Sequence, residues 1–173
     1  MSRVLLVATT TGYQIRSFGE AAAKLGVELV VASDRCDHLE DPWRDGAIAI
    51  RLHDRAASVR AVQSALADRP VRGVVAVGDR PAVLAAAVAS SMGLPGNTVE
   101  AAERSRNKLL ARHAFQALRL PVPRFSLVSP GAIPLQVAEH ASYPAVVKPL
   151  ALSGSRGVIR VDDAAACAVA VDR

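Results

Sequence analysis

The sequence is poor in aromatic residues and in cysteine. Phe, Trp and Tyr make up 3% of its 173 residues, whereas 51% are hydrophobic. We therefore expect a core of small aliphatic side chains, as in the layered α/β proteins. The two cysteines, Cys36 and Cys167, have neither the CxxC spacing of a zinc site nor the density of a disulfide scaffold. Cys167 is expected to pack in a helix and Cys36 to lie in a loop, with a reactive thiol beside Arg35 and His38 as the alternative.

Long apolar runs and processing signals are also missing. No stretch of about 18 uninterrupted apolar residues occurs, which argues against a membrane span. Residues 1–14, MSRVLLVATTTGYQ, contain a short apolar run but no small-residue cleavage site of the signal-peptide type. We therefore expect a cytoplasmic protein with one sizeable core, or one domain and part of a second.

The net charge of +5 comes from a single segment, because residues 101–124 contain six cations and one anion and the rest of the chain sums to zero. The cations are Arg104, Arg106, Lys108, Arg112, Arg119 and Arg124. Such a concentration fits a compact anionic ligand at least as well as a nucleic acid, and the shortage of stacking aromatics makes nucleic acid the weaker interpretation. For Arg104, Arg106, Arg112 and His113 a solvated helix face is expected, with contact to a substrate carboxylate or phosphate as the alternative.

Apolar runs alternate with helix-period segments in the first part of the chain. Buried strands are predicted at 3–9, 27–33, 47–52 and 73–79. Valine-rich strands separated by helices indicate a parallel sheet covered on both faces. We therefore predict an α/β fold that begins with a small doubly wound, Rossmann-like domain over residues 1–96. The first turn lacks the G-x-G-x-x-G pattern and Asp34 is expected in a solvated turn, so an NAD(P)-binding oxidoreductase domain is the weaker alternative.

Residues 97–173 are predicted to form part of a second, α+β domain. It opens with the helix-capping sequence Asn97-Thr98-Val99-Glu100. We expect one continuous helix from there to the prolines that follow, with Arg104, Lys108 and Arg112 stacked along one face.

Strands are predicted next at 124–128, 143–148 and 157–161. In the second of these, alternation places Val146 and Lys148 on one face and Ala145 and Val147 on the other. Lys148 is therefore expected to leave the strand pointing as a core residue points. A lysine in that position needs an anion.

A loop of small residues, LSGSRGV at 152–158, follows this strand. Gly154 and Gly157 permit unusual backbone angles, and Ser153 and Ser155 offer hydroxyl donors beside exposed amides. Such a loop suits a polyphosphate, although a glycine-rich hairpin with an ordinary edge lysine is the open alternative. It is not a Walker A loop, because the lysine precedes the glycines.

The order of these features resembles the ATP-grasp ligases. Asn107-Lys108 on a helix and the turn LPVP at 120–123 are followed, about forty residues after the lysine, by VVKP at 146–149 and the serine and glycine loop. Arg119 stands where many members have glycine. The resemblance implies a pre-ATP-grasp domain followed by the first lobe of the ATP-grasp domain. It further implies an ATP-dependent ligase that activates a carboxylate as an acyl phosphate for attack by an amine or another nucleophile.

The same resemblance implies the site residues. Lys108 and Lys148 would contact ATP phosphates, with Lys148 also near the adenine. A mobile loop would close over the β- and γ-phosphates; its residues are Ser153, Gly154, Ser155, Arg156 and Gly157. Mg²⁺ would bridge the phosphates, but its acidic and amide ligands lie farther downstream in the family, and Asp162 and Asp163 fit better as a helix cap. No metal ligand is expected in this chain.

The expected partners are therefore ATP and a small carboxylate. No membrane partner is expected and nucleic acid is the weaker interpretation. A homodimer is left open. We expect the chain to be the N-terminal portion of a ligase that does not turn over alone. A non-catalytic nucleotide-binding or interaction module of ATP-grasp origin is the alternative.

Overall fold

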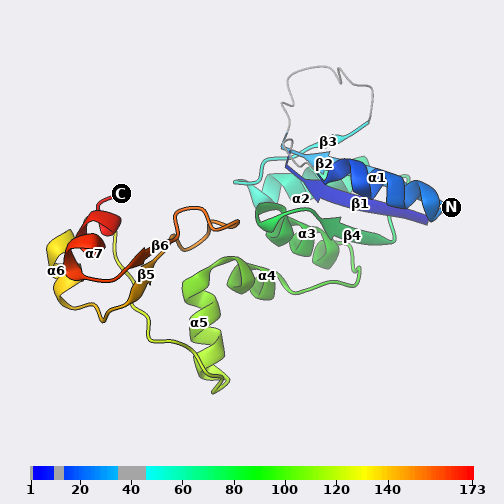
Figure 1. Ribbon diagram of the computed structural model, residues 1–173. Coiled ribbons are helices and arrows are strands. Elements are labelled where there is room, and N and C mark those ends of the chain that lie inside the picture. The colour runs from blue at the N-terminus through cyan, green and yellow to red at the C-terminus, as the bar shows by residue number, and fades with distance from the viewer. Residues whose placement is uncertain (1, 10–13, 35–45) are drawn as a thin grey trace. The chain divides into compact units, whose positions relative to one another are not determined.

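The computed structural model describes residues 2–9, 14–34 and 46–173 (Figure 1). The chain forms two compact units, Met1–Arg106 and Asn107–Arg173. The division falls later than the expected boundary after residue 96. The reason is that Val99 and Ala102, in the helix that follows this boundary, pack with Val83 and Ala86 of the first unit.

A four-stranded parallel sheet forms the centre of the first unit, in the order β3-β2-β1-β4. Its strands are β1 (Ser2–Ala8), β2 (Val27–Ser33), β3 (Ile48–Ala49) and β4 (Gly73–Ala76), and its helices are α1 (Ile15–Lys24), α2 (Arg55–Ala65), α3 (Asp79–Ser91) and α4 (Val99–Arg106). The predicted third strand is shorter than expected, since only two residues of β3 pair with β2.

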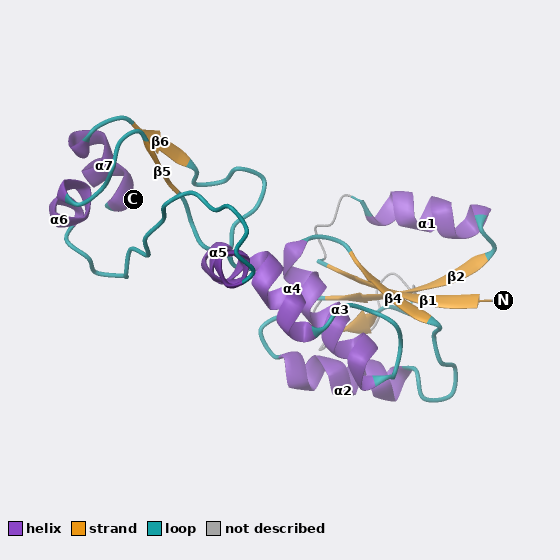
Figure 2. Ribbon diagram, turned by 90° about the horizontal axis from the view of Figure 1, so that it is seen from below, coloured by secondary structure: helices purple, strands orange, loops and turns teal. Residues whose placement is uncertain are grey.

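Alternating side chains of β1 form the core on both faces of this sheet. Leu5 and Val7 are fully buried with residues of α2 and α3, whereas Leu6 and Ala8 are fully buried with residues of α1. Figure 2 shows α1 on one side of the sheet and α2 and α3 on the other. The predicted doubly wound sheet is therefore confirmed.

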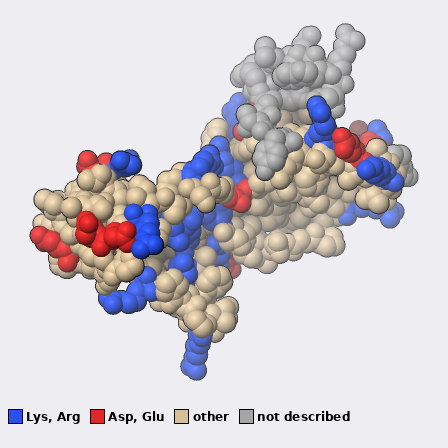
Figure 3. Space-filling view, in the orientation of Figure 1, with Lys and Arg blue, Asp and Glu red and all other residues tan. Residues whose placement is uncertain are grey.

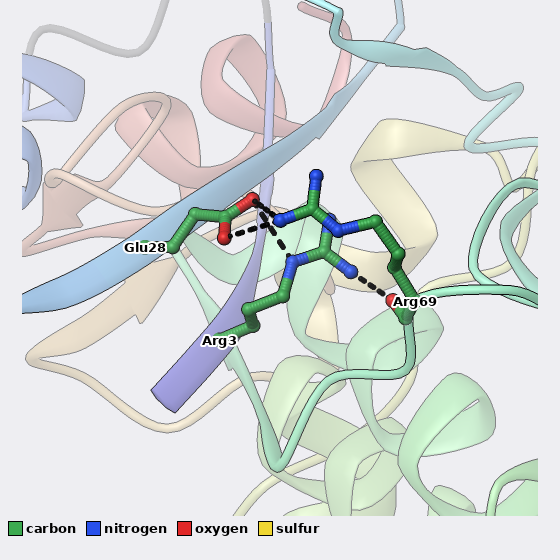
Figure 4. Close-up of polar contacts among 3 residues, drawn as sticks. All are labelled: Arg3, Glu28 and Arg69. Carbon is green, nitrogen blue, oxygen red and sulfur yellow. Dashed lines mark hydrogen bonds and ion pairs between the residues drawn. The ribbon is translucent and has the colours of Figure 1, made fainter. Parts of the chain in front are cut away.

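An ionic cluster joins the amino-terminal ends of β1 and β2 (Figure 4). Arg3 stands opposite Glu28 in the strand register, and its Nε donates to Glu28 Oε1 at 2.9 Å. Arg69, in the segment before β4, donates from Nη2 to Glu28 Oε2 at 2.9 Å, and its carbonyl oxygen accepts from Arg3 Nη1. One carboxylate therefore connects two strands and a loop.

The second unit contains an antiparallel pair of short strands and three helices. Its elements are α5 (Lys108–Ala117), α6 (Pro134–Glu139), β5 (Ala145–Val147), β6 (Ile159–Val161) and α7 (Ala164–Val171). Ala138, Val161, Cys167 and Ala170 form its buried core, so Cys167 packs in a helix as expected. The predicted α+β arrangement is confirmed. No helix of the described residues is both long and apolar enough to cross a bilayer.

The predicted strand at 124–128 does not form. Leu127 is 52% exposed and Val128 is 37% exposed. β5 and β6 pair with each other, and a strand without a partner has no ladder for its backbone groups. The apolar pattern alone therefore gave the wrong secondary structure there.

The predicted continuous helix is broken at Asn107. This residue has an extended backbone, and its side-chain oxygen accepts from the amides of Leu109 at 3.0 Å and Leu110 at 3.2 Å, so it is the N-cap of α5. Arg104 therefore lies on α4, where it pairs with Glu100 at 2.6 Å, and not in one column with the cations of α5. The expected stack of three cations is wrong.

Candidate functional site

Lys148 directly follows β5 and is exposed. Ala145 and Val147 are the residues of β5 that pack against the core of the second unit, while Val146 is 54% exposed. Lys148 lies on the same face of the strand as Val146, which is the exposed face. The expectation that its side chain points toward the core is therefore wrong. Its ammonium has no hydrogen-bond or ion-pair partner in the part of the chain that the structure describes. An unpaired cation therefore marks the end of this strand.

The loop after Lys148 has an unusual backbone. Gly154, Ser155 and Gly157 adopt positive φ angles of 65°, 56° and 68°. Only Gly adopts this region without strain, so Ser155 holds a conformation that side chains rarely take. Within the loop, the amides of Arg156 and Val158 point to the carbonyl oxygens of Ser153 and Ser155, each at 3.4 Å.

Gly157 also has a packing role. A Cβ placed on it would lie 2.8 Å from Cγ and 3.1 Å from Cδ of Pro149. Since Val147 pairs with Ile159 across β5 and β6, this contact closes the base of the hairpin. Within the loop, Arg156 Nε donates to the carbonyl oxygen of Ser153 at 3.1 Å.

Lys108 reaches this loop from α5. Its Nζ donates to the carbonyl oxygen of Leu152 at 2.7 Å and lies 3.5 Å from that of Leu150. Its backbone amide donates to the same Leu150 oxygen at 2.9 Å. The structure thus brings Lys108 beside the start of the loop, although the two are more than forty positions apart in sequence. Sequence reasoning selected the lysine but missed the carbonyl oxygens that it binds.

The acidic side chains of the second unit gather at one end. In Figure 3 they lie mainly over α6 and α7, with some basic side chains beside them, and further basic side chains lie over α5. Asp163 caps α7, as expected, by accepting from the amide of Ala166 at 2.8 Å, and Asp162 pairs with Arg160 at 2.9 Å. Neither carboxylate is therefore paired with Lys108 or Lys148.

The other candidate residues show no shared site. Arg106 ends α4, and Arg112 lies on α5, where it forms no hydrogen bond or ion pair with the described loop residues. His113 packs edge-on against Phe125, with 5.5 Å between ring centroids. Asp34 follows β2 and is exposed, and Cys36 lies outside the described residues. Among the described residues there is no group of three or more His, Cys, Asp or Glu that could hold a metal ion.

One titratable group of the second unit has a clearly perturbed pKa. Burial raises the pKa of the Tyr143 phenol to about 12, with further contributions from the Cys167 thiol and the Asp163 carboxylate. Its hydroxyl donates to the carbonyl oxygen of Ala138 at 2.6 Å. This contact joins α6 to the residues just before β5, on the core side of the strand that leads to Lys148.

The chain thus combines a parallel α/β unit with a small α+β unit that contains the glycine loop. Residues 19–96 match the ATP-grasp N-terminal domain family. D-alanine–D-alanine ligase of Lactococcus lactis is 35% identical over 74 residues, which are 40% of this chain and 21% of that protein. The resemblance of the chain to the ATP-grasp ligases is therefore confirmed, and the family match lies within the first unit.

Solved structures extend the likeness in fold to the second unit. The L-amino acid ligase of Bacillus licheniformis has a TM-score of 0.75 at 24% identity, covering 99% of this chain and 42% of that one. The N5-carboxyaminoimidazole synthase of Aspergillus clavatus, solved with ADP and 5-aminoimidazole ribonucleotide, has a TM-score of 0.66 at 21% identity, covering 99% of this chain and 43% of that one. The chain thus spans less than half the length of these structures.

Proposed function

We propose that this chain supplies one wall of the ATP site of an ATP-dependent ligase. The observation that carries the proposal is the convergence, in the second unit, of Lys108 on the glycine loop that Lys148 introduces. Lys108, Lys148 and the loop residues Ser153, Gly154, Ser155, Arg156 and Gly157 would hold the phosphates.

The local chemistry supports a phosphate ligand. Lysine is a compact point charge that commonly binds phosphate, and Lys148 is exposed and unpaired. The loop adds two serine hydroxyl groups on an exposed stretch of backbone that contains two glycines. Donors and cations fixed before a phosphoryl group is transferred stabilise the charge that develops on it.

For the reaction we propose carboxylate activation. A carboxylate oxygen attacks the γ-phosphorus of ATP, which forms an acyl phosphate as ADP leaves. An amine or another nucleophile then attacks the carbonyl carbon, and inorganic phosphate leaves with the electron pair of the broken C–O bond. In this scheme the residues of the second unit bind and orient the triphosphate.

The described residues do not fit a Mg²⁺ site. Asp163 is used as a helix cap and Asp162 is paired with Arg160. Elsewhere among the described residues no three or more His, Cys, Asp or Glu side chains gather as a group that could hold a metal ion. We therefore assign no step to a metal held by this chain.

Calorimetric titration with ATP tests the proposal. Lys148→Met is expected to weaken binding by about 10-fold or more, because a charge-assisted contact contributes about 1.5–3 kcal/mol. Arg124→Met removes an exposed cation of the same unit that lies outside the loop, so it should leave the affinity within about twofold. Equal loss in both variants, or tighter binding of NAD than of ATP, would contradict the proposal.

A second assay separates the ligase from the binding-module alternative. ADP release is measured with the purified chain and a panel of small carboxylic acids. We expect ATP binding without ADP release, because the described residues offer no acidic metal-binding group. Sustained ADP release would show that the chain turns over by itself.

A further inference from the structure

The glycine loop is attached to the rest of the second unit at two points. At its end, Gly157 packs against Pro149 without room for a Cβ. At its start, the carbonyl oxygen of Leu152 accepts from Lys108 Nζ at 2.7 Å. The residues between these attachments are exposed, and their turn contacts are long: the amides of Arg156 and Val158 lie 3.4 Å from the carbonyl oxygens of Ser153 and Ser155.

The attachment at the start of the loop comes from one residue. Lys108 binds Leu150 through its backbone amide at 2.9 Å and Leu152 through its ammonium group. Asn107 fixes the position of Lys108, because its side chain caps α5 through two amides. The first turn of α5 therefore holds the chain that leads into the loop.

We infer that Lys108 is a positioning residue that sets the place of the glycine loop before any ligand binds. Its ammonium group has three N–H donors, and the carbonyl oxygens of Leu150 and Leu152 are its protein partners. Residues 153–156 then lie between two held points, the carbonyl oxygen of Leu152 and the glycine at 157. That the loop binds a triphosphate rests on the proposed function. That Lys108 holds the start of the loop does not.

Cleavage by an arginine-specific protease tests this inference in the ligand-free protein. Arg156 lies in the exposed loop, so its rate of cleavage reports how often the loop opens. Lys108→Met is expected to raise this rate about fivefold, since one hydrogen-bonded attachment is lost. Lys108→Arg keeps donors within reach of the carbonyl oxygens and should restore most of the protection.

Lys148→Met is the matched control, because it removes a lysine near the loop that forms no hydrogen bond or ion pair with the described residues. It should leave cleavage at Arg156 unchanged without ligand. Hydrogen exchange at the amides of 153–156 gives a second readout, and the thermal midpoint shows whether the whole unit is destabilised. Wild-type rates in Lys108→Met, or equal acceleration at arginines outside the loop, would overturn the inference.

The test also separates this inference from the proposed function. ATP should slow cleavage at Arg156 in the wild-type protein if the loop binds phosphate. Acceleration in Lys108→Met without any effect of ATP on the wild type would support the positioning role and contradict the ATP site. Protection of the wild type by ATP, together with a wild-type cleavage rate in ligand-free Lys108→Met, would support the ATP site and contradict the positioning role.

Discussion

Gly157 lies so close to Pro149 that a Cβ on the glycine would come within 2.8 Å of the proline Cγ. The contact joins the end of the glycine loop to the residue that follows Lys148. It therefore fixes the distance between the proposed phosphate loop and its cation. Gly154, at the other end of the loop, also has a positive φ angle but has open space where a Cβ would be.

Gly157→Ala should accordingly be more damaging than Gly154→Ala. Each substitution forces a side chain into the left-handed region, at a cost of about 1–2 kcal/mol. Only Gly157→Ala must also displace Pro149, so it should reduce hydrogen-exchange protection of β5 and β6 further and weaken ATP binding. Equal effects of the two variants would show that the contact with Pro149 does not hold the hairpin.

The C-terminal end of α5 carries an arginine in a position that favours glycine. Arg119 has a φ of 56°, its amide donates to the carbonyl oxygen of Gln116, and the amide of Leu120 donates to that of Phe115, both at 2.9 Å. These two bonds form a Schellman motif with Arg119 at its left-handed position. The turn therefore keeps its geometry although Arg119 stands where many ATP-grasp ligases have glycine.

Arg119→Gly should stabilise α5 by about 1 kcal/mol, since it relieves the left-handed strain. Exchange of the α5 amides should then slow by about fivefold. Arg119→Ala is the control, because it removes the same charge and keeps the strain. A gain in the alanine variant as large as in the glycine variant would assign the effect to charge.

The parallel sheet could be predicted because strands buried on both faces have continuous apolar sequences. The predicted strand at 27–33 coincides with β2, and that at 3–9 is displaced by one residue from β1. The break at Asn107 was missed, because asparagine occurs both within helices and at their caps. Whether the helix continues through Asn107 or begins again there depends on a chain segment more than forty residues away, where the carbonyl oxygen of Leu150 accepts from the amide of Lys108.

The orientation of Lys148 could not be predicted for a related reason. β5 has apolar side chains on both faces, so alternation alone does not show which face is buried. The packing of Ala145 and Val147 with the core of the second unit decides this, and that packing is set by residues distant in sequence. The choice of Lys108, Lys148 and the loop as ATP ligands came from the family resemblance and stays a prediction.

In the first unit, Glu28→Gln should cause a clear loss of stability. The Arg3 side chain is only 14% exposed and shares the Glu28 carboxylate with Arg69. Removal of that charge leaves a largely buried guanidinium without its counterion, so we expect a loss of about 1–2 kcal/mol in the free energy of unfolding by urea. The matched control is Glu100→Gln, since the Glu100–Arg104 pair on α4 is exposed and should contribute about 0.3–0.5 kcal/mol. A loss at Glu28 no larger than at Glu100 would show that the cluster does not hold β1 to β2.

Tyr143 should make the second unit sensitive to alkaline pH. Below pH 10 the phenol is protonated in the folded and unfolded chains alike, whereas between pH 10 and about 12 only the unfolded chain loses its proton. The folded state then binds more protons, so stability falls as the pH rises through this window. Thermal unfolding of wild type and Tyr143→Phe at pH 9 and pH 11 tests the effect, because the variant lacks only the phenol hydroxyl group.

The phenylalanine variant should be less stable at pH 9, where it lacks the hydrogen bond to Ala138, but should lose less stability on going to pH 11. Ultraviolet titration gives an independent measure, since the phenolate absorbance missing from the variant should develop in the wild type above pH 11. A tyrosine that titrates near pH 10 in that difference spectrum would contradict its burial beside Cys167 and Asp163. The core side of β5 would then be open to solvent, and the strand that carries Lys148 would be less firmly held than its packing against Ala138 and Cys167 indicates.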